Sequence, residues 1–131
     1  MEQARQATSA FDMLGGMPVV KRIVDRFYDL LDEQPDYAEL RALHAPDLAP
    51  MRDSLAGFLA AWLGGPRDWF VQHPGRCMMS AHRSVAMSPA VGRQWGDAMR
   101  MAIAETPVDP AFGAKLAEAL AGLARDMAAS G

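Results

Sequence analysis

The stretch that decides how this chain is interpreted is MMSAHRSVAMSPAVGRQW, residues 78–95. It places His82 after a patch of methionine and small residues, and Trp95 follows thirteen residues later. Between them, Ser88-Pro89 predicts a helix start, because serine caps free N–H groups and proline is tolerated in the first turn. From its residue type alone, His82 is either a core histidine bonded to a carbonyl or an axial ligand to a metal.

Outward from this stretch, apolar residues recur at the spacing of amphipathic helices. In a helix over 18–33 the predicted inward residues are Val20, Ile23, Val24, Phe27, Tyr28, Leu30 and Leu31. In the helix after Asp47 they are Leu48, Met51, Leu55, Phe58, Leu59 and Trp62. In the helix after Pro89 they are Val91, Trp95, Ala98, Met99 and Ala102, and in the helix after Pro110 they are Phe112, Leu116, Leu120, Leu123 and Met127. No segment shows the period-two alternation of a half-buried strand. The predicted fold class is therefore all-α.

Polar and conformationally special residues set the expected helix ends. Ser9, Asp47 and Asp109 are suited to cap helix starts, and residues 37–43 and 76–83 are expected to form short helices. The glycine pairs 15–16 and 64–65 are expected to end helices as left-handed caps. Residues 1–9 are expected to be frayed, and residues 10–131 to form one domain.

Composition excludes several classes of function. The net charge is −3 without a Lys/Arg run, which argues against nucleic-acid and anionic-membrane partners. Cys77 is the only cysteine, so neither a disulfide framework nor a thiolate metal cluster is expected. No apolar run is long enough to span a membrane, and the N-terminus lacks the apolar region of a signal peptide. A cytoplasmic location is therefore expected.

The sequence also lacks the common catalytic and metal-binding motifs. It contains no Gly-x-Ser-x-Gly, no phosphate-binding loop and no His-x-x-x-His, and the inward helix faces carry almost no carboxylates. A zinc site needs three or four convergent ligands, and a di-iron bundle needs several inward glutamates. After these exclusions, one kind of metal site remains possible. In it the protein supplies a single ligand and the metal brings its own equatorial donors, as iron does in haem.

Several segments resemble a known family. They are Gly15-Gly16 before Pro18-Val19-Val20, Arg26-Phe27-Tyr28, Phe58-Leu59-Ala60-Ala61-Trp62-Leu63-Gly64-Gly65-Pro66, and His82. In this order they resemble the truncated haemoglobins, and the tryptophan in Gln94-Trp95 resembles the group II branch in particular. The resemblance covers about residues 10–128. It implies a two-over-two helical sandwich that encloses haem b.

The resemblance also implies roles for individual residues. His82 would be the proximal iron ligand, while Tyr28, Trp95 and His44 would lie on the distal side. His44 is either a solvent-facing loop residue, a member of the distal hydrogen-bond network, or a sixth iron ligand. Ala81 stands where group II proteins commonly carry an arginine that pairs with a haem propionate. The other residues expected to contact the cofactor are Met51, Leu55, Phe58, Leu59, Arg67, Trp69 and Met78, with Arg76 and Arg83 as further propionate candidates.

These roles imply a protein that binds O₂ and other diatomic ligands and is reduced by an unidentified reductase, as a monomer or a homodimer. NO or peroxide chemistry is a further activity that such a site would support, because distal donors polarise a peroxide. A hexacoordinate haem protein for electron transfer or sensing is the alternative within this class. A haem-free helical interaction module is the alternative outside it.

Overall fold

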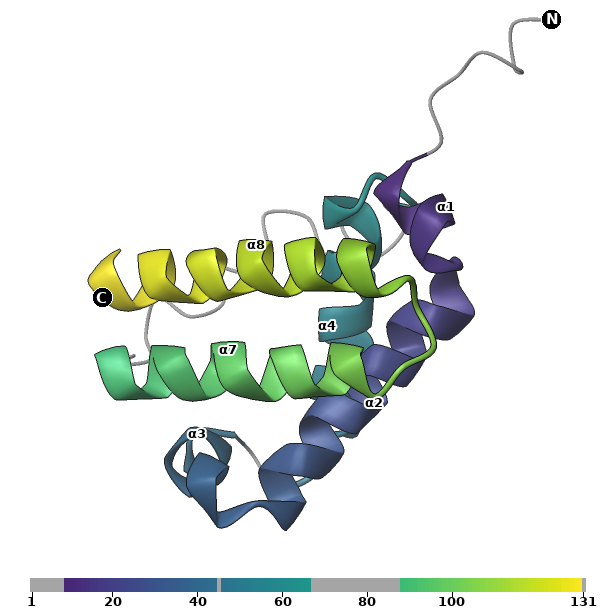
Figure 1. Cartoon of the computed structure of the whole chain (residues 1–131). Coiled ribbons are helices and arrows are strands. Elements are labelled where there is room, and N and C mark those ends of the chain that lie inside the picture. Colours follow the sequence, from purple (N-terminus) through teal and green to yellow (C-terminus); the bar gives the residue numbers. More distant parts are fainter. Residues whose placement is uncertain (1–8, 45, 67–87, 131) are drawn as a thin grey trace, which may run out of the picture.

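The structure, a computed structural model, describes residues 9–44, 46–66 and 88–130, with the backbone alone for residues 127–130 (Figure 1). Every element in these ranges is helical, so the all-α prediction is confirmed. The elements are α1 (Ala10–Leu14), α2 (Met17–Glu33), the 3₁₀ turn η2 (Pro35–Tyr37), α3 (Ala38–Ala42), α4 (Ala49–Trp62), α7 (Pro89–Ala104) and α8 (Pro110–Ser130).

Helices α7 and α8 form an antiparallel pair whose axes lie side by side (Figure 1). Glycines bring the two backbones together. A Cβ atom added to Gly96 would lie 3.2 Å from Cβ of Ala121, and one added to Gly113 would lie 3.2 Å from Cγ2 of Ile103. At these distances a larger residue would push the helices apart, so the small residues determine how closely the pair packs.

Helix α2 runs across this pair and contacts both α4 and α7 (Figure 1). Its predicted inward face is confirmed, since all seven of its predicted residues are buried and Phe27 and Leu30 have no exposed surface. Pro18 lies in its first turn, as expected from proline's fixed φ angle. Helix α2 therefore supplies the central core surface on which α4 and α7 pack.

The predicted caps are confirmed at three helix starts. Ser9 Oγ accepts from the Asp12 N–H, Ser88 Oγ from the Val91 N–H, and Asp109 Oδ2 from the Phe112 N–H. The prediction for Asp47 was one residue off. The cap position of α4 is Leu48, and Asp47 Oδ1 accepts from the Ala49 N–H instead. Asp47 still satisfies one of the helix's free donors.

The predicted inward face of α4 was wrong at Trp62, which is 41% exposed. The residues of α4 and its C-cap that are buried in the core are Leu55, Ala56, Leu59, Ala60, Ala61 and Leu63. The buried face of α4 is thus rotated toward its small alanines, which allow close packing of helices, and away from the bulkier Trp62. On α7 and α8 the predicted core residues are buried or half-buried, and the side chain of Met127 lies outside the described part of the chain.

The two glycines that follow α4 have different roles. Gly64 adopts a positive φ of 91°, as predicted for a left-handed cap. Gly65 does not, but a Cβ atom there would lie 2.4 Å from Cγ of Phe11. The Phe11 N–H also donates to the Leu63 carbonyl at 3.0 Å. The second glycine therefore allows α1 to pack on the end of α4.

Candidate functional site

Tyr28 lies at the centre of the candidate site, on the buried face of α2. Its side chain is 3% exposed and its ring contacts Phe27 edge-on, with 4.9 Å between ring centroids. Burial raises the pKa of the Tyr28 hydroxyl well above its ordinary value of 10.0, while the positive charge of Arg52 acts in the opposite direction. The hydroxyl is therefore protonated at neutral pH and remains a hydrogen-bond donor.

Arg52 on α4 holds α4 against α2 beside this tyrosine. Its Nη1 donates to the Asp25 carbonyl at 3.0 Å and to Asp25 Oδ1 at 3.1 Å, and its Nη2 donates to Asp29 Oδ1 at 3.0 Å. Its guanidinium carbon lies 5.8 Å from the Tyr28 ring centroid, within cation–π range. Arg52 therefore fixes the spacing of α2 and α4 at the level of Tyr28.

His44 follows α3 and contacts Tyr28. The two ring centroids are 5.7 Å apart and the rings meet edge to face at 79°. His44 Nδ1 lies 3.0 Å from the Leu40 carbonyl oxygen, which only accepts, so Nδ1 carries the proton. In the neutral ring the lone pair is then on Nε2. This partly buried position differs from the solvent-facing loop histidine that was one of the alternatives.

Trp95 reaches the same cluster from α7. It is 4% exposed, and its ring lies 5.5 Å from that of Phe27, centroid to centroid. Phe27 thus stands between Tyr28 and Trp95, and the three aromatic residues form one continuous group in the core. The structure brings Tyr28 of α2, Trp95 of α7 and His44, which follows α3, into one region.

Helix α4 presents two apolar surfaces near this group. Leu55 and Leu59 are buried in the core, at 5% and 3% exposed. Met51 and Phe58 lie on the other flank and are only partly buried against the same core. Partly covered apolar side chains beside a buried tyrosine fit a flat apolar group such as haem, which would complete the burial of these side chains. The Tyr28 hydroxyl makes no hydrogen bond with any group in the described part of the chain, which also fits a ligand-facing donor.

Four of the predicted site residues, Arg67, Trp69, Met78 and His82, lie outside the described residues. So do the short helix predicted over 76–83 and the further propionate candidates Arg76 and Arg83. The proximal ligand and the propionate contacts therefore stay predictions. Within the described ranges, no three His, Cys, Asp or Glu side chains come together to form a metal site.

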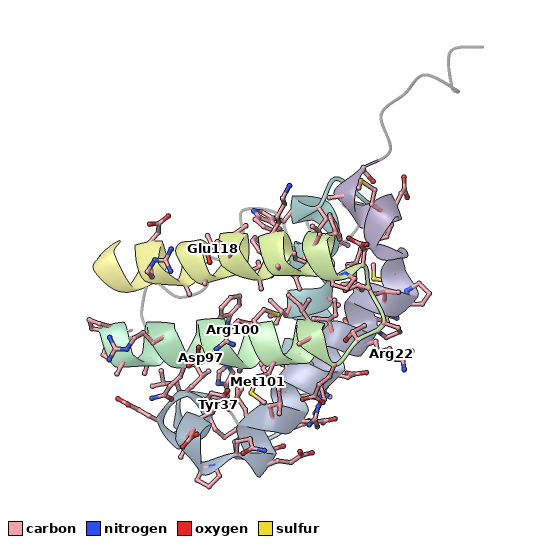
Figure 2. The ribbon with its side chains drawn as sticks, viewed as in Figure 1. Arg22, Tyr37, Asp97, Arg100, Met101 and Glu118 are labelled. Carbon is pink, nitrogen blue, oxygen red and sulfur yellow. The ribbon has the colours of Figure 1, made fainter. Side chains whose placement is uncertain are left out.

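A separate groove of about 640 Å³ lies along α7 and α8, away from Tyr28. Its floor is made of small residues such as Gly96, Gly113 and Ala121, and charged side chains such as Arg100 and Glu118 stand along it (Figure 2). Since those small residues are explained by the close packing of the two helices, the groove does not define a binding site by itself.

Sequence reasoning missed the contacts of two residues near the site: Arg52, and Gln94 on α7, whose amide bonds Leu40 and Glu39 of α3. A signal for Arg52 was present in Asp25 and Asp29, an acidic pair one helical turn apart on the helix that carries Tyr28. Gln94 gave no periodic signal, because a polar residue between inward positions usually faces solvent. Its role depends on α3, which only the tertiary structure brings to α7.

The described helices thus enclose an aromatic cluster between α2 and α7, with Arg52 of α4 beside it. A family model described as "Bacterial-like globin" matches residues 9–129. The group II 2-on-2 hemoglobin from Agrobacterium tumefaciens matches with 26% identity and a TM-score of 0.87, over 95% of this chain and 96% of that one. The group II truncated hemoglobin from Bacillus anthracis matches with 25% identity and a TM-score of 0.83, over 94% and 92%.

A cold-adapted truncated hemoglobin from Pseudoalteromonas haloplanktis TAC125 shares the fold with a TM-score of 0.86, at 24% identity over 92% of this chain and 97% of that one. A comparison with curated protein sequences gives no significant match. The chain belongs to the bacterial-like globin family. The predicted resemblance to group II truncated haemoglobins is confirmed, and with it the two-over-two fold of a haem-binding globin.

No helix in the described ranges is both long enough and apolar enough to cross a bilayer.

Proposed function

We propose that this globin holds haem b through His82 and binds O₂ or other diatomic ligands on the side lined by Tyr28, His44 and Trp95. Bound haem would supply the iron that takes the diatomic ligand. The observation that carries the proposal is Tyr28, whose side chain is 3% exposed and whose hydroxyl makes no hydrogen bond to any residue that the structure describes. A protonated, desolvated donor of this kind is suited to hold a ligand that carries partial negative charge.

The other residues then have distinct tasks. Trp95 adds an indole N–H, which only donates, and Leu55, Phe58 and Leu59 exclude water from the site. Met51 on the partly covered flank of α4 would narrow ligand entry. Arg67 and Trp69, with Arg76 and Arg83, are our candidates for the haem propionates, since the position before His82 is Ala81. Met78 would contribute to the proximal floor.

Haem uptake tests the cofactor and its ligand. We expect the purified chain, with haem supplied, to show a Soret band near ~410 nm that His82→Ala abolishes or strongly shifts. His73→Ala is the matched control and should leave the band in place. An unchanged spectrum in His82→Ala would remove the proximal assignment. A protein that stays colourless would favour the haem-free interaction module instead.

O₂ release rates test the distal donors. Loss of one charge-assisted hydrogen bond of about 1.5 to 3 kcal/mol should accelerate release by about 10-fold to 150-fold in Tyr28→Phe, and by a similar order in Trp95→Phe. Trp62→Phe is the matched control, because Trp62 is 41% exposed. Rates that do not change in either distal variant would mean that these donors point elsewhere.

A hexacoordinate state is the second candidate, and the His44 geometry favours it. Because Nδ1–H faces the Leu40 carbonyl, Nε2 carries the lone pair that coordination to iron requires. In this state the protein would serve electron transfer or sensing. NO or peroxide conversion, oxygen transport, a reductase partner, a cytoplasmic location and a monomeric or homodimeric state are further parts of our proposal, all of which depend on haem uptake.

A further inference from the structure

Gln94 on α7 makes two hydrogen bonds to the segment that precedes His44. Its Oε1 accepts from the Leu40 N–H at 3.0 Å, and its Nε2 donates to Glu39 Oε1 at 3.2 Å. The two bonds together orient the amide. In a flipped amide the NH₂ group would face the Leu40 N–H, donor to donor, and the oxygen would face Glu39 Oε1, acceptor to acceptor. Gln94 therefore holds α3 with both ends of its amide.

The Leu40 N–H needs such a partner. Helix α3 has only five residues, and the side chain of its cap residue, Tyr37, makes no capping hydrogen bond. Leu40 is the third residue of the helix, where an N–H has no partner within the helix and is normally capped by a side chain from the preceding segment. Here a side chain from α7 takes that place. A short helix of this kind is marginal by itself and depends on tertiary contacts.

The Leu40 carbonyl continues the connection to His44. Its oxygen accepts from the Leu43 N–H at 3.2 Å and lies 3.0 Å from His44 Nδ1. Leu40 is therefore bonded to Gln94 on its N–H side and to His44 on its carbonyl side. Loosening of this turn at the end of α3 would separate the carbonyl from the ring and release the constraint on which nitrogen carries the proton.

A second contact anchors the start of the same segment. The Tyr37 hydroxyl donates to Met101 Sδ at 3.2 Å, and Figure 2 shows the two side chains next to each other between η2 and α7. A hydrogen bond to a thioether is weak, so this contact places the segment against α7 without setting its rotation. The Gln94 amide, with two directed bonds, sets the rotation.

We infer that Gln94 is a positioning residue, which caps α3 from α7 and thereby sets the place and the Nδ1–H tautomer of His44 against Tyr28. Its effect on ligand release rests on the function proposed above. Its effect on Leu40 and His44 does not, since it follows from bonds within the chain. The two effects are measured separately.

The first measurement is NMR on the chain as purified, reduced under carbon monoxide so that any haem present is diamagnetic. We expect Gln94→Met, which keeps the volume and removes the amide, to speed exchange of the Leu40 amide by about fivefold, as expected for one net hydrogen bond. The ring nitrogens of His44 should change from one Nδ1–H tautomer to a mixture. Arg93→Met, on the neighbouring exposed residue of α7, should change neither.

A charge-preserving swap separates positioning from general damage. Gln94→Glu alone keeps an acceptor for Leu40 but opposes Glu39, so it should loosen α3. In the double variant that combines Gln94→Glu with Glu39→Gln, both hydrogen bonds are restored, and the negative charge moves from α3 to α7. The double variant should return Leu40 exchange and the His44 tautomer to wild type. A purely structural defect at position 94 would not be repaired in this way.

The inference is overturned if Gln94→Met leaves both Leu40 exchange and the His44 tautomer unchanged, or if the swap fails to restore them. Where haem is bound, Gln94→Met should also accelerate O₂ release relative to Arg93→Met. Unchanged release with a changed tautomer would overturn the link to the ligand. A colourless protein would overturn the proposed function, while the Leu40 and His44 measurements would still decide the positioning role.

Discussion

Arg52 of α4 lies with its guanidinium carbon 5.8 Å from the ring centroid of Tyr28 on α2, and the same side chain bonds Asp25 and Asp29 of that helix. One residue thus joins the two helices and covers the tyrosine. Its side chain is 28% exposed, so its ion pairs are only partly screened by water. The ring of the buried tyrosine is therefore in contact with a partly exposed arginine that two aspartates hold in place.

Replacing this arginine should destabilise the fold measurably. We expect Arg52→Met to lower the free energy of unfolding by about 1 to 2 kcal/mol, because the hydrogen bonds to both aspartates and the cation–π contact are lost while the apolar stem is kept. Arg22→Met, on an exposed residue of α2, is the control and should stay within about 0.5 kcal/mol of wild type. Urea unfolding measures both, and a difference that does not shrink with added salt would contradict an electrostatic role.

Alkaline pH should unfold the protein through its buried tyrosine. Burial raises the folded-state pKa of Tyr28 above the unfolded value of 10.0. The unfolded chain then loses this proton first, so stability is full below about pH 10 and falls as the pH rises toward the folded pKa. The slope is about 1.4 kcal/mol per pH unit for one such group.

The matched variants are Tyr28→Phe and Tyr37→Phe. Tyr28→Phe should remove most of the loss of stability above pH 10, measured by urea unfolding at successive pH values. The pKa of Tyr37 is also raised, by burial first and then by Asp97 and Asp36, so Tyr37→Phe should remove a smaller part. Equal slopes in wild type and Tyr28→Phe would show that the hydroxyl is not desolvated.

The contact between Gly65 and Phe11 predicts contrasting effects of alanine at two glycines. Gly65→Ala would place a Cβ atom 2.4 Å from Cγ of Phe11 and should cost about 1 to 3 kcal/mol through displacement of α1. Gly122→Ala, in the middle of α8, has only Arg125 Nη2 at 3.6 Å and should be neutral or stabilise by up to about 1 kcal/mol. Thermal unfolding of both variants provides the comparison, and equal effects would argue against the packing of α1 on α4.

The His44 hypothesis predicts a change in the ferric spectrum of the haem-loaded protein. If Nε2 is a sixth ligand, the wild type should be low-spin near neutral pH and His44→Ala should become high-spin. A wild-type spectrum that is high-spin at every pH, and unchanged in His44→Ala, would exclude the hexacoordinate alternative. It would leave His44 as a member of the distal hydrogen-bond network or as a structural residue.

Much of the fold follows from local patterns that can be read along the chain. The caps at Ser9, Ser88 and Asp109 and the buried face of α2 depend on short-range rules, namely free N–H groups at helix starts and a period of 3.6 residues. The predicted positions of Tyr28 and Trp95 on inward faces were confirmed for the same reason. Local hydrogen bonding and periodicity are sufficient to place these three caps and the buried face of α2.

Contacts between helices were decided only by the tertiary structure. Trp62 satisfied the spacing of the inward stripe of α4, yet the buried face of this helix includes Ala56, Ala60 and Ala61 and leaves Trp62 exposed. Periodicity likewise did not indicate that Arg52 covers Tyr28 or that Gln94 caps α3, because both are polar side chains whose partners come from helices distant in the sequence. A sequence determines which faces are apolar, but the rotation and pairing of those faces depend on how whole helices pack together.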